Sequence, residues 1–374
     1  MSRATSPTRG VWPRQRIRVT GGAVRTPLSA RLPRALSPFG GMPADSSRCL
    51  VTLSRLPAGE REDTMARVSW GGIVDEAMRA VARAYGLGEP IGPVVYAARG
   101  ELGRIWRLET VRGPWAVKEL LVPAEERAAR EDAEFQLAAG KAGVRLPRPV
   151  VTAEGDVLFE GRWRVYEWVD LVAGEVVTGA ELGTVTAGLH QVGHPPSGPV
   201  VPWFAGPVGR AGWEELAAAG GEWAPALERA LPDLVALDAL VAAPGSLITT
   251  CHRDVNVENV CRAADGGVIV LDWENCGPAR PAWELAGILV DLPLEDAVAA
   301  YRAYRDAGGP ATVAEPADFS MAIATQGHLL EFYARRALSA EESEENRGRA
   351  RARLRAMLDR PLTRERIDDI LAAL

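Results

Sequence analysis

Acidic and amide side chains recur at fixed spacing between residues 250 and 275, which read TCHRDVNVENVCRAADGGVIVLDWEN. Asp254 lies in an HRD triplet, Asn259 follows it by five residues, and Asp272 ends the apolar run 268–271. Carboxylate and amide oxygens are the hard ligands that magnesium prefers, and a nearby carboxylate can orient a hydroxyl or accept its proton. We therefore expect Asn259 and Asp272 to hold a divalent metal on a phosphate, and Asp254 to act on an attacking hydroxyl.

The same residue types are also common in turns, and Asp265-Gly266-Gly267 is itself a turn signal. If the HxD triplet stood alone, an ordinary turn would explain it. The whole pattern is H-x-D-x4-N followed by a turn, an apolar strand and a further Asp, and it favours a site for metal and phosphate.

Lys118 lies in the middle of an apolar strand pattern, residues 115–120. Lysine is rare in this chain, since Lys118 and Lys141 are the two lysines among 43 basic residues. A compact ammonium on a flexible stem can reach between two phosphates, whereas a planar guanidinium fits them differently. The alternative is a lysine at a strand edge whose ammonium extends to solvent. With the acidic motif downstream, the phosphate role is the favoured interpretation.

The segment 124–141 has the charged and apolar pattern of a helix. We expect an acidic residue of this helix to pair with Lys118 and hold it in place. Glu131 is the first choice because it lies one helical turn before the apolar Phe135, and Glu134 is the alternative.

Two backbone segments suit contact with a nucleotide. Gly100 and Gly103 lie in a turn between two strand patterns, where glycine lets the main chain approach phosphates, although a plain hairpin would look the same. Glu167, Trp168 and Val169 end a later strand and lead into a loop. At such a junction between lobes, a flat base can bond to backbone groups.

Composition limits the classes of protein to consider. The chain has 374 residues, of which 47% are hydrophobic and 25% charged, as in ordinary globular proteins. Its four cysteines form no CxxC pair, so we expect neither a zinc site nor a disulfide framework. We expect the protein to lie in a reducing, cytoplasmic compartment. No apolar run approaches the roughly 18 residues of a membrane span, so no membrane partner is expected.

Residues 1–64 differ from the rest of the chain. They hold eleven Arg and four acidic residues, a net charge of about +7, which leaves about −13 for the remainder. This segment is expected to be a disordered basic leader, or to precede a true start at Met65. A targeting peptide and a nucleic-acid-binding arm are the alternatives, and we expect no nucleic-acid partner.

Taken in order, the glycine turn and the motifs AVKEL, EWV, CHRDVNVENV and VLDWENCG resemble the aminoglycoside phosphotransferase and choline kinase family, which is similar in fold to protein kinases. The resemblance covers about residues 90–340. It implies an α+β, bilobal fold, with a small antiparallel-sheet lobe over residues 65–168 that binds nucleotide. It also implies a larger, mainly helical lobe over residues 169–374 that carries the catalytic residues and binds the acceptor.

The resemblance also implies roles for the matching residues. Lys118, with Glu131 as its partner, would contact the phosphates of ATP, and the backbone of residues 167–169 would hold the adenine. Asp254 would be the catalytic base, while Asn259 and Asp272 would bind Mg²⁺. The family usually has an Asp before Leu-Ala that braces the catalytic loop, and Glu284, which stands at this position here, could still do so.

The expected function is an ATP- and Mg²⁺-dependent transfer of the γ-phosphate to a hydroxyl of a small molecule. An aminoglycoside-like antibiotic, an amino alcohol, a sugar or an amino acid could be the acceptor, and the negative charge after Met65 would suit a cationic one. The alternatives are a kinase-fold binding or regulatory protein without turnover, and a nucleic-acid-binding protein acting through residues 1–64. The sequence leaves the oligomeric state open.

Overall fold

The computed structural model describes residues 64–100 and 103–374, with the backbone alone for residues 64–73. All of these residues belong to one compact unit of the chain. The basic leader expected at the N-terminus lies outside the described residues, apart from Thr64, which begins the first helix.

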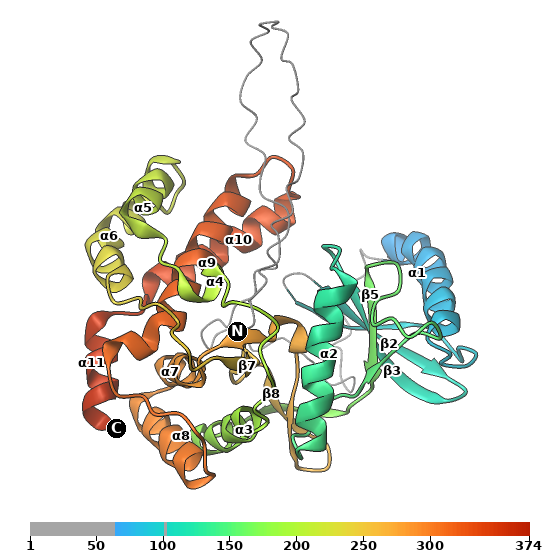
Figure 1. Cartoon of the computed structure of the whole chain (residues 1–374). Helices are drawn as coiled ribbons and strands as arrows, with labels where there is room; N and C mark the ends of the chain where they lie inside the picture. The colour runs from blue at the N-terminus through green and yellow to red at the C-terminus, as the bar shows by residue number, and fades with distance from the viewer. Residues whose placement is uncertain (1–63, 101–102) are drawn as a thin grey trace, which may run out of the picture. The chain divides into compact units, whose positions relative to one another are not determined.

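The N-terminal lobe is built on a five-stranded antiparallel sheet in the order β1-β2-β3-β5-β4. Figure 1 labels three of its strands, β2, β3 and β5. Its strands are β1 Val95–Arg99, β2 Gly103–Thr110, β3 Gly113–Leu120, β4 Pro149–Val150 and β5 Trp163–Glu167. In this register Lys118 on the central strand β3 lies between Ile105 of β2 and Arg164 of β5. The sheet therefore fixes the backbone of Lys118 on both sides.

Two helices flank this sheet on opposite sides, α1 (Thr64–Ala84) and α2 (Glu126–Lys141) (Figure 1). Helix α1 buries apolar side chains such as Met78 against Val117 of the sheet. On α2, the ring of Phe135 lies 5.7 Å from the ring of Trp273, which follows Asp272 directly in the chain. Helix α2 is thus packed between the sheet and the segment that carries Asp272.

Residues 168–374, all of which the structure describes, are mainly helical and contain two small antiparallel sheets. One sheet joins β6 Leu171–Val176, β8 Val260–Ala263 and β9 Val268–Val270, and the other joins β7 Thr249–Cys251 and β10 Gly277–Ala279. The helices are α3 Gly179–Gln191, α4 Pro202–Ala205, α5 Gly209–Ala218, α6 Ala224–Asp238, α7 Pro281–Asp291, α8 Leu294–Asp306, α9 Ser320–Leu338, α10 Glu344–Asp359 and α11 Arg364–Ala373, with short 3₁₀ turns η1 Trp273–Asn275 and η2 Pro316–Phe319.

The helical lobe has two main hydrophobic clusters. One joins α3, α7, α8 and α11 beneath the small sheets, and the other joins α5, α6, α9 and α10. Helix α3 lies directly on the backbone of α8, because a Cβ on Gly183 would lie 2.0 Å from the carbonyl oxygen of Ala300. Glycine is therefore required at this position for the observed packing.

These elements confirm the predicted α+β class with a small sheet lobe and a larger, mainly helical lobe. The boundary between residues 168 and 169 stays a prediction. None of the described helices combines the length and the apolar character that a bilayer crossing needs.

Candidate active site

The HRD segment forms a tight loop between β7 and β8, and Arg253 sets its shape. Arg253 has a left-handed backbone conformation with φ 64°, which a non-glycine residue adopts when its surroundings hold it there. Its backbone N–H donates to a carboxylate oxygen of Glu284, and its Nε donates to the carbonyl oxygen of Asn275 at 2.6 Å. Its guanidinium lies 4.1 Å from the centre of the Phe204 ring. The loop is therefore fixed from two sides.

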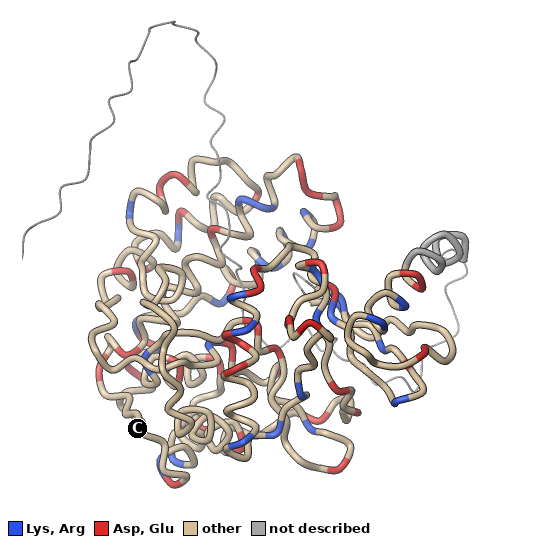
Figure 2. The backbone as a smooth tube through the Cα atoms, turned by 45° about the vertical axis from the view of Figure 1, so that its right-hand side comes forward, with Lys and Arg blue, Asp and Glu red and all other residues tan. Residues whose placement is uncertain are grey.

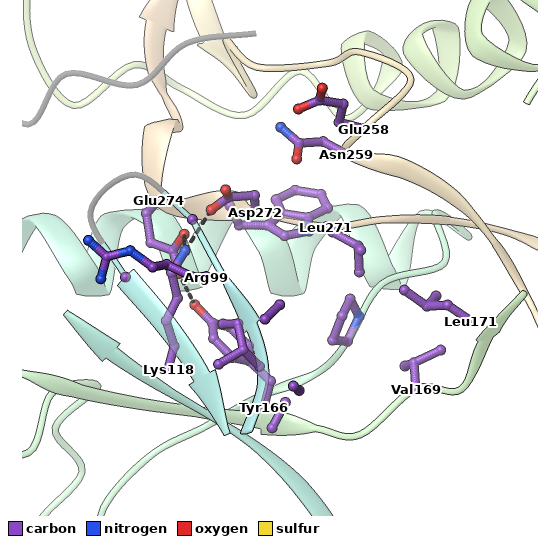
Figure 3. A pocket seen from close by; sticks show the side chains of 18 of the residues that line it. Arg99, Lys118, Tyr166, Val169, Leu171, Glu258, Asn259, Leu271, Asp272 and Glu274 are labelled. Carbon is purple, nitrogen blue, oxygen red and sulfur yellow. Dashed lines mark hydrogen bonds and ion pairs between the residues drawn. The ribbon is translucent and has the colours of Figure 1, made fainter. Parts of the chain in front are cut away.

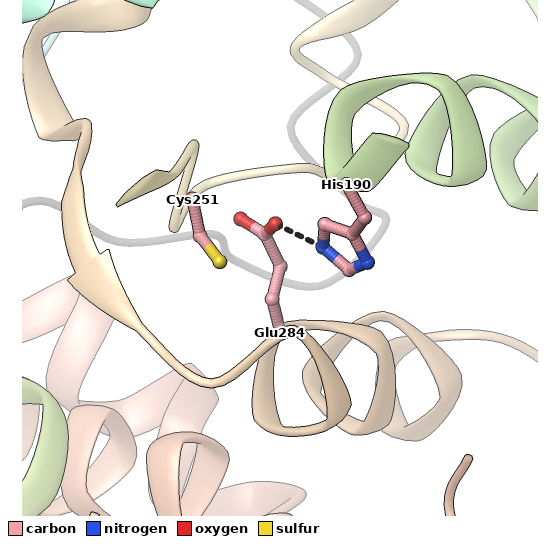
Figure 4. Close-up of side chains that lie close together, drawn as sticks. All are labelled: His190, Cys251 and Glu284. Atoms are coloured by element: carbon pink, nitrogen blue, oxygen red, sulfur yellow. Dashed lines mark hydrogen bonds and ion pairs between the residues drawn. The ribbon is translucent and has the colours of Figure 1, made fainter. Parts of the chain in front are cut away.

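Glu284 is itself held by a buried histidine behind the loop (Figure 4). The second oxygen of Glu284 lies 2.7 Å from Nε2 of His190, whose Nδ1 lies 2.8 Å from the hydroxyl of Tyr304. The contact expected of Glu284 with the catalytic loop is therefore confirmed. His190, Cys251 and Glu284 lie close enough to resemble a metal-ligand set, with their ligand atoms within 4.8 Å of one another. Because both nitrogens of His190 are already engaged, we interpret the cluster as a brace.

His252 connects the HRD loop to the strand that leads to Asp272. Its Nε2 lies 3.0 Å from the carbonyl oxygen of Leu271, and its ring packs edge-on against Trp273 at 4.9 Å. Burial lowers the pKa of His252, so the ring is neutral and Nε2 donates to this carbonyl. His252 thereby keeps Asp272 beside the HRD loop.

Asp254 is buried and oriented by amide groups. Its carboxylate accepts from Nδ2 of Asn256 at 2.9 Å and from Nδ2 of Asn275 at 3.2 Å. Asn259 donates through Nδ2 to the backbone carbonyl of Asp254 at 2.9 Å. Burial, followed by the nearby charge of Asp272, raises the pKa of Asp254 well above its usual range. A carboxylate with a raised pKa is a stronger base toward a hydroxyl.

Lys118 reaches from the sheet to the two acids of the DWE segment (Figure 3). Its Nζ lies 2.7 Å from Asp272 and 2.5 Å from Glu274. Burial alone would lower the pKa of Lys118, but the charges of Asp272 and Glu274 raise it overall, so its ammonium is charged. Asp272 has a left-handed backbone, with φ 60°, and this turn brings both carboxylates to the same ammonium.

Glu274 is anchored to the N-terminal lobe by a buried polar network. The hydroxyl of Tyr166 donates to it at 2.7 Å, and the guanidinium of Arg164 lies 3.9 Å away. Arg164 is 2% exposed and also pairs with Asp132 of α2 at 3.2 Å. Burial opposes ionisation of Glu274, but Lys118 and Arg164 hold the pKa of Glu274 well below its usual range.

The predicted pair between Lys118 and Glu131 is wrong. Glu131 instead binds Arg127 at 2.6 Å on the same helix, and the alternative, Glu134, is exposed. Successive helical residues point about 100° apart, and α2 directs Asp132 and Gln136 inward rather than either glutamate. The helix still reaches Lys118, but through Asp132, Arg164 and Glu274.

A cavity of about 320 Å³ opens between the sheet and the helical lobe. Apart from Glu131, every residue predicted to contact nucleotide, metal or acceptor lines it: Gly100, Gly103, Lys118, Glu167, Trp168, Val169, Asp254, Asn259 and Asp272. Figure 3 shows Lys118, Asp272 and Glu274 together at one end and Val169 and Leu171 at the other. The cavity therefore has a charged end and an apolar end, as a nucleotide requires.

The glycine turn lies over the charged end. The backbone N–H of Gly100 donates to the carbonyl of Gly103 at 2.9 Å and closes the turn, whose residues 101–102 lie outside the described part of the chain. A Cβ on Gly103 would come within 3.0 Å of Cε of Lys118. Glycine at position 103 therefore leaves room for the lysine side chain.

Several lining residues were not predicted from the sequence. Glu274 follows Asp272 by two residues and lines the cavity. A buried Lys118 needs carboxylates to balance its charge, and this need could have indicated Glu274 as a partner. Arg349 and Arg353 come from α10, and Tyr333 comes from α9. Nothing in the local sequence of α10 distinguishes these arginines from the others in that helix, since their role depends on tertiary packing.

Comparison with known proteins identifies the family of the chain. The model of the phosphotransferase enzyme family matches residues 94–321, which is more than half of the chain. The chain belongs to this family. No curated protein sequence matches it significantly.

Solved structures resemble the whole fold at low sequence identity. A spectinomycin phosphotransferase, solved with ADP and spectinomycin, is 13% identical and superposes with a TM-score of 0.59, covering 80% of this chain and 98% of its own. A choline kinase from Streptococcus pneumoniae is 14% identical, with a TM-score of 0.51 and coverages of 77% and 99%. An amicoumacin kinase, solved with AMP-PNP and Ca²⁺, is 13% identical, with a TM-score of 0.51 and coverages of 81% and 97%. These likenesses show that the fold is protein-kinase-like.

Proposed function

We propose that the protein transfers the γ-phosphate of ATP to a hydroxyl of a small molecule, with Mg²⁺ as its metal. The observation that carries this proposal is the convergence of Lys118, Asp272, Asn259 and Asp254 on one cavity, with Lys118 and Asp272 in direct contact at 2.7 Å. The cation comes from the sheet lobe and the carboxylates from the helical lobe, so the charges needed for phosphoryl transfer meet where the lobes face each other.

The donor set fits magnesium. Asn259 uses its amide nitrogen to bind the backbone of Asp254, so its side-chain oxygen is the atom that can face a cation. Lys118 contacts Oδ1 of Asp272, and Oδ2 is the second oxygen of that carboxylate. Both are the hard oxygen ligands that Mg²⁺ prefers. When bound, Mg²⁺ would neutralise charge on the β- and γ-phosphates.

In the proposed reaction the acceptor oxygen forms a bond to the γ-phosphorus while the bond from that phosphorus to the bridging oxygen of ADP breaks. Asp254 orients the hydroxyl and takes its proton, which then passes to solvent, and ADP leaves. Lys118 stabilises the phosphate charge, and its contact with Glu274 holds the lysine ammonium in place. The apolar end, with the backbone of residues 167–169, would receive the base. The roles are mainly positioning and electrostatic.

A screen for ADP release tests this proposal. The full-length protein is incubated with ATP, Mg²⁺ and a panel of antibiotics, amino alcohols, sugars and amino acids, beside the Asp254→Asn variant. We expect one acceptor class to stimulate ADP release, and the variant to lose about 10³-fold in kcat while its affinity for ATP changes little. Asp265→Asn is the matched control, because Asp265 lies in an exposed turn and pairs with Arg145. Equal ADP release by wild type and Asp254→Asn under all conditions would favour a kinase-fold protein without turnover.

A further inference from the structure

Lys118 and Arg164 lie directly opposite each other on the neighbouring strands β3 and β5. Directly opposite residues of an antiparallel pair project from the same face of the sheet, where two like charges are unfavourable. The side chains of Lys118 and Arg164 are 13% and 2% exposed, so little water screens one charge from the other. The acids of the active site must therefore balance two buried cations rather than one.

Glu274 contacts both of these cations. Its Oε2 lies 2.5 Å from Nζ of Lys118, and its Oε1 lies 3.9 Å from Nη1 of Arg164. Oε1 also accepts a hydrogen bond of 2.7 Å from the hydroxyl of Tyr166, and Figure 3 shows Lys118 and Tyr166 reaching Glu274 together. Burial raises the pKa of Tyr166 well above its usual range, so this hydroxyl keeps its proton and remains a donor. One oxygen of Glu274 thus contacts Lys118, and the other is held by residues of β5.

Arg164 is held in turn by helix α2, where Asp132 lies 3.2 Å from its Nη1. Acidic and basic positions are scattered over the described chain (Figure 2), and in a neighbouring ion pair of α2, Arg127 with Glu131, the arginine is 74% exposed. The pair of Arg164 with Asp132 is buried instead, and a buried ion pair adds little net stability over apolar residues of similar volume. Stability alone therefore gives no reason for an arginine at this position, whereas its place beside the active-site acids does.

The geometry of the Lys118 ammonium connects Glu274 to the transfer. An ammonium has three N–H donors, and two of them are directed to Asp272 and Glu274. The remaining donor can reach a phosphate, and its direction depends on where the two carboxylates hold the nitrogen. Asp272 is also the proposed metal ligand, so Glu274 is the partner that must keep its place when nucleotide and metal bind.

We infer that Arg164 and Tyr166 are positioning residues for the transfer: they fix Glu274, which in turn aims the ammonium of Lys118 at the phosphates. The inference rests on the proposed phosphotransferase function and adds to it two residues that act through Glu274. Asp132 completes the arrangement by holding Arg164, and in this way α2 contributes to the position of Lys118.

Removing the buried pair as a unit separates a structural role from a positioning role. The full-length double variant Asp132→Leu, Arg164→Met keeps the net charge and should fold, because apolar residues of similar volume often replace a buried ion pair without loss of stability. We expect its kcat/KM for ATP to fall by roughly tenfold or more, with the KM for the acceptor within about twofold of wild type. Arg164→Lys, which keeps the charge, should retain more activity. The matched control, Arg127→Met with Glu131→Leu, removes the exposed pair of the same helix and should stay within about twofold of wild type.

A double-mutant cycle tests whether Arg164 and Tyr166 act through Glu274. Tyr166→Phe removes the hydroxyl that binds Glu274 but keeps the ring, so it should fold and lower kcat/KM for ATP by roughly three- to tenfold. In a Glu274→Gln background, neither Tyr166→Phe nor the pair variant should cause a further loss beyond about twofold, because the carboxylate that they position is already absent. The Kd of ATP–Mg²⁺, measured by calorimetry on the same proteins, should follow the same pattern, and thermal melts establish which variants are folded.

Two outcomes would overturn the inference. One is a folded pair variant and a Tyr166→Phe variant that both match wild type in kcat/KM and in Kd. The other is a loss as large in the Glu274→Gln background as in wild type, since Arg164 and Tyr166 would then act independently of Glu274. If the pair variant does not fold, the cycles of Tyr166→Phe and Arg164→Lys with Glu274→Gln decide the matter.

Failure of the proposed function would be seen separately. If wild type releases no ADP with any acceptor but binds ATP–Mg²⁺, the proposed function fails, and the cycle in Kd still decides whether Arg164 and Tyr166 act through Glu274. Absence of ATP–Mg²⁺ binding by wild type would remove both the function and the inference.

Discussion

Asp272 and Glu274 share the ammonium of Lys118, but their surroundings give them different tasks. The side chain of Glu274 is 8% exposed and is bound by Tyr166, whereas that of Asp272 is 36% exposed and faces the cavity. A buried, fully bonded carboxylate is suited to hold Lys118, and an accessible one is suited to bind a metal. We therefore propose that Glu274 positions Lys118 and Asp272 serves the cation.

Removing the charge of Glu274 tests this division. Glu274→Gln should leave Lys118 short of a carboxylate and lower kcat/KM for ATP by roughly 10- to 100-fold. Glu131→Gln, on the exposed face of α2, is the control and should stay within about twofold of wild type. Steady-state kinetics at varied ATP measure both. A large loss in Glu131→Gln with a normal Glu274→Gln would contradict the structural assignment.

The convergence of Asp254, Asn259 and Asp272 was predictable, because these residues lie close together in the sequence and their spacing places them on one loop and the strand that follows it. The partner of Lys118 was not, because helical phase decides which acid of α2 faces inward. An error of one residue turns a helix position by about 100°. Burial of Arg164 beside Asp132 shows that α2 sends a different acid toward the site, and no local signal in the sequence marks that choice.

Among the elements, α7 joins the HRD loop to the helical core through Glu284. One oxygen of this side chain accepts from the backbone of Arg253 and the other contacts His190 of α3, which in turn contacts Tyr304 of α8. Three helices thereby hold one strained loop. The longer side chain of Glu, in place of the Asp expected of the family, lets a single carboxylate reach both partners.

The reach of Glu284 can be tested by shortening it. Glu284→Asp removes one methylene, so the carboxylate should lose either Arg253 or His190, and the free energy of unfolding should fall by about 1–3 kcal/mol. Since the loop that carries Asp254 loosens, kcat should fall more than the KM for ATP rises. Denaturant melts and steady-state kinetics measure the two effects. Unchanged stability together with unchanged kcat would show that the brace is not needed.

The fold class was predictable because the order of glycine turn, strand lysine, helix and acidic motifs resembles that of a known family, and the resemblance implied the fold. The arrangement around α10 was not, because this helix is rich in arginine on several faces and some of its charges pair locally, as Arg347 and Arg351 do with Glu344. Which arginines line the cavity follows from the packing of α10 on α9, which involves residues far apart in the sequence.

At the scale of the whole molecule, the cavity is lined by both lobes, so a nucleotide bound there should stabilise them together. At a concentration of one hundred times its dissociation constant, ATP–Mg²⁺ adds about 2.7 kcal/mol to the free energy of unfolding, which raises Tm by roughly 5 °C. Lys118→Ala should lose most of this shift. Lys141→Ala, which removes the other lysine from an exposed position at the end of α2, should keep it. A full shift in Lys118→Ala would argue against nucleotide binding at this cavity.

The most direct test of the central claim follows the phosphate itself. ATP labelled in the γ-phosphate is incubated with Mg²⁺ and the acceptor that stimulates ADP release, and the products are separated. The proposal predicts that the label moves to the hydroxyl of the acceptor with the wild-type protein and does not move with Asp254→Asn. Label found as inorganic phosphate alone, or transferred equally by both proteins, would contradict it.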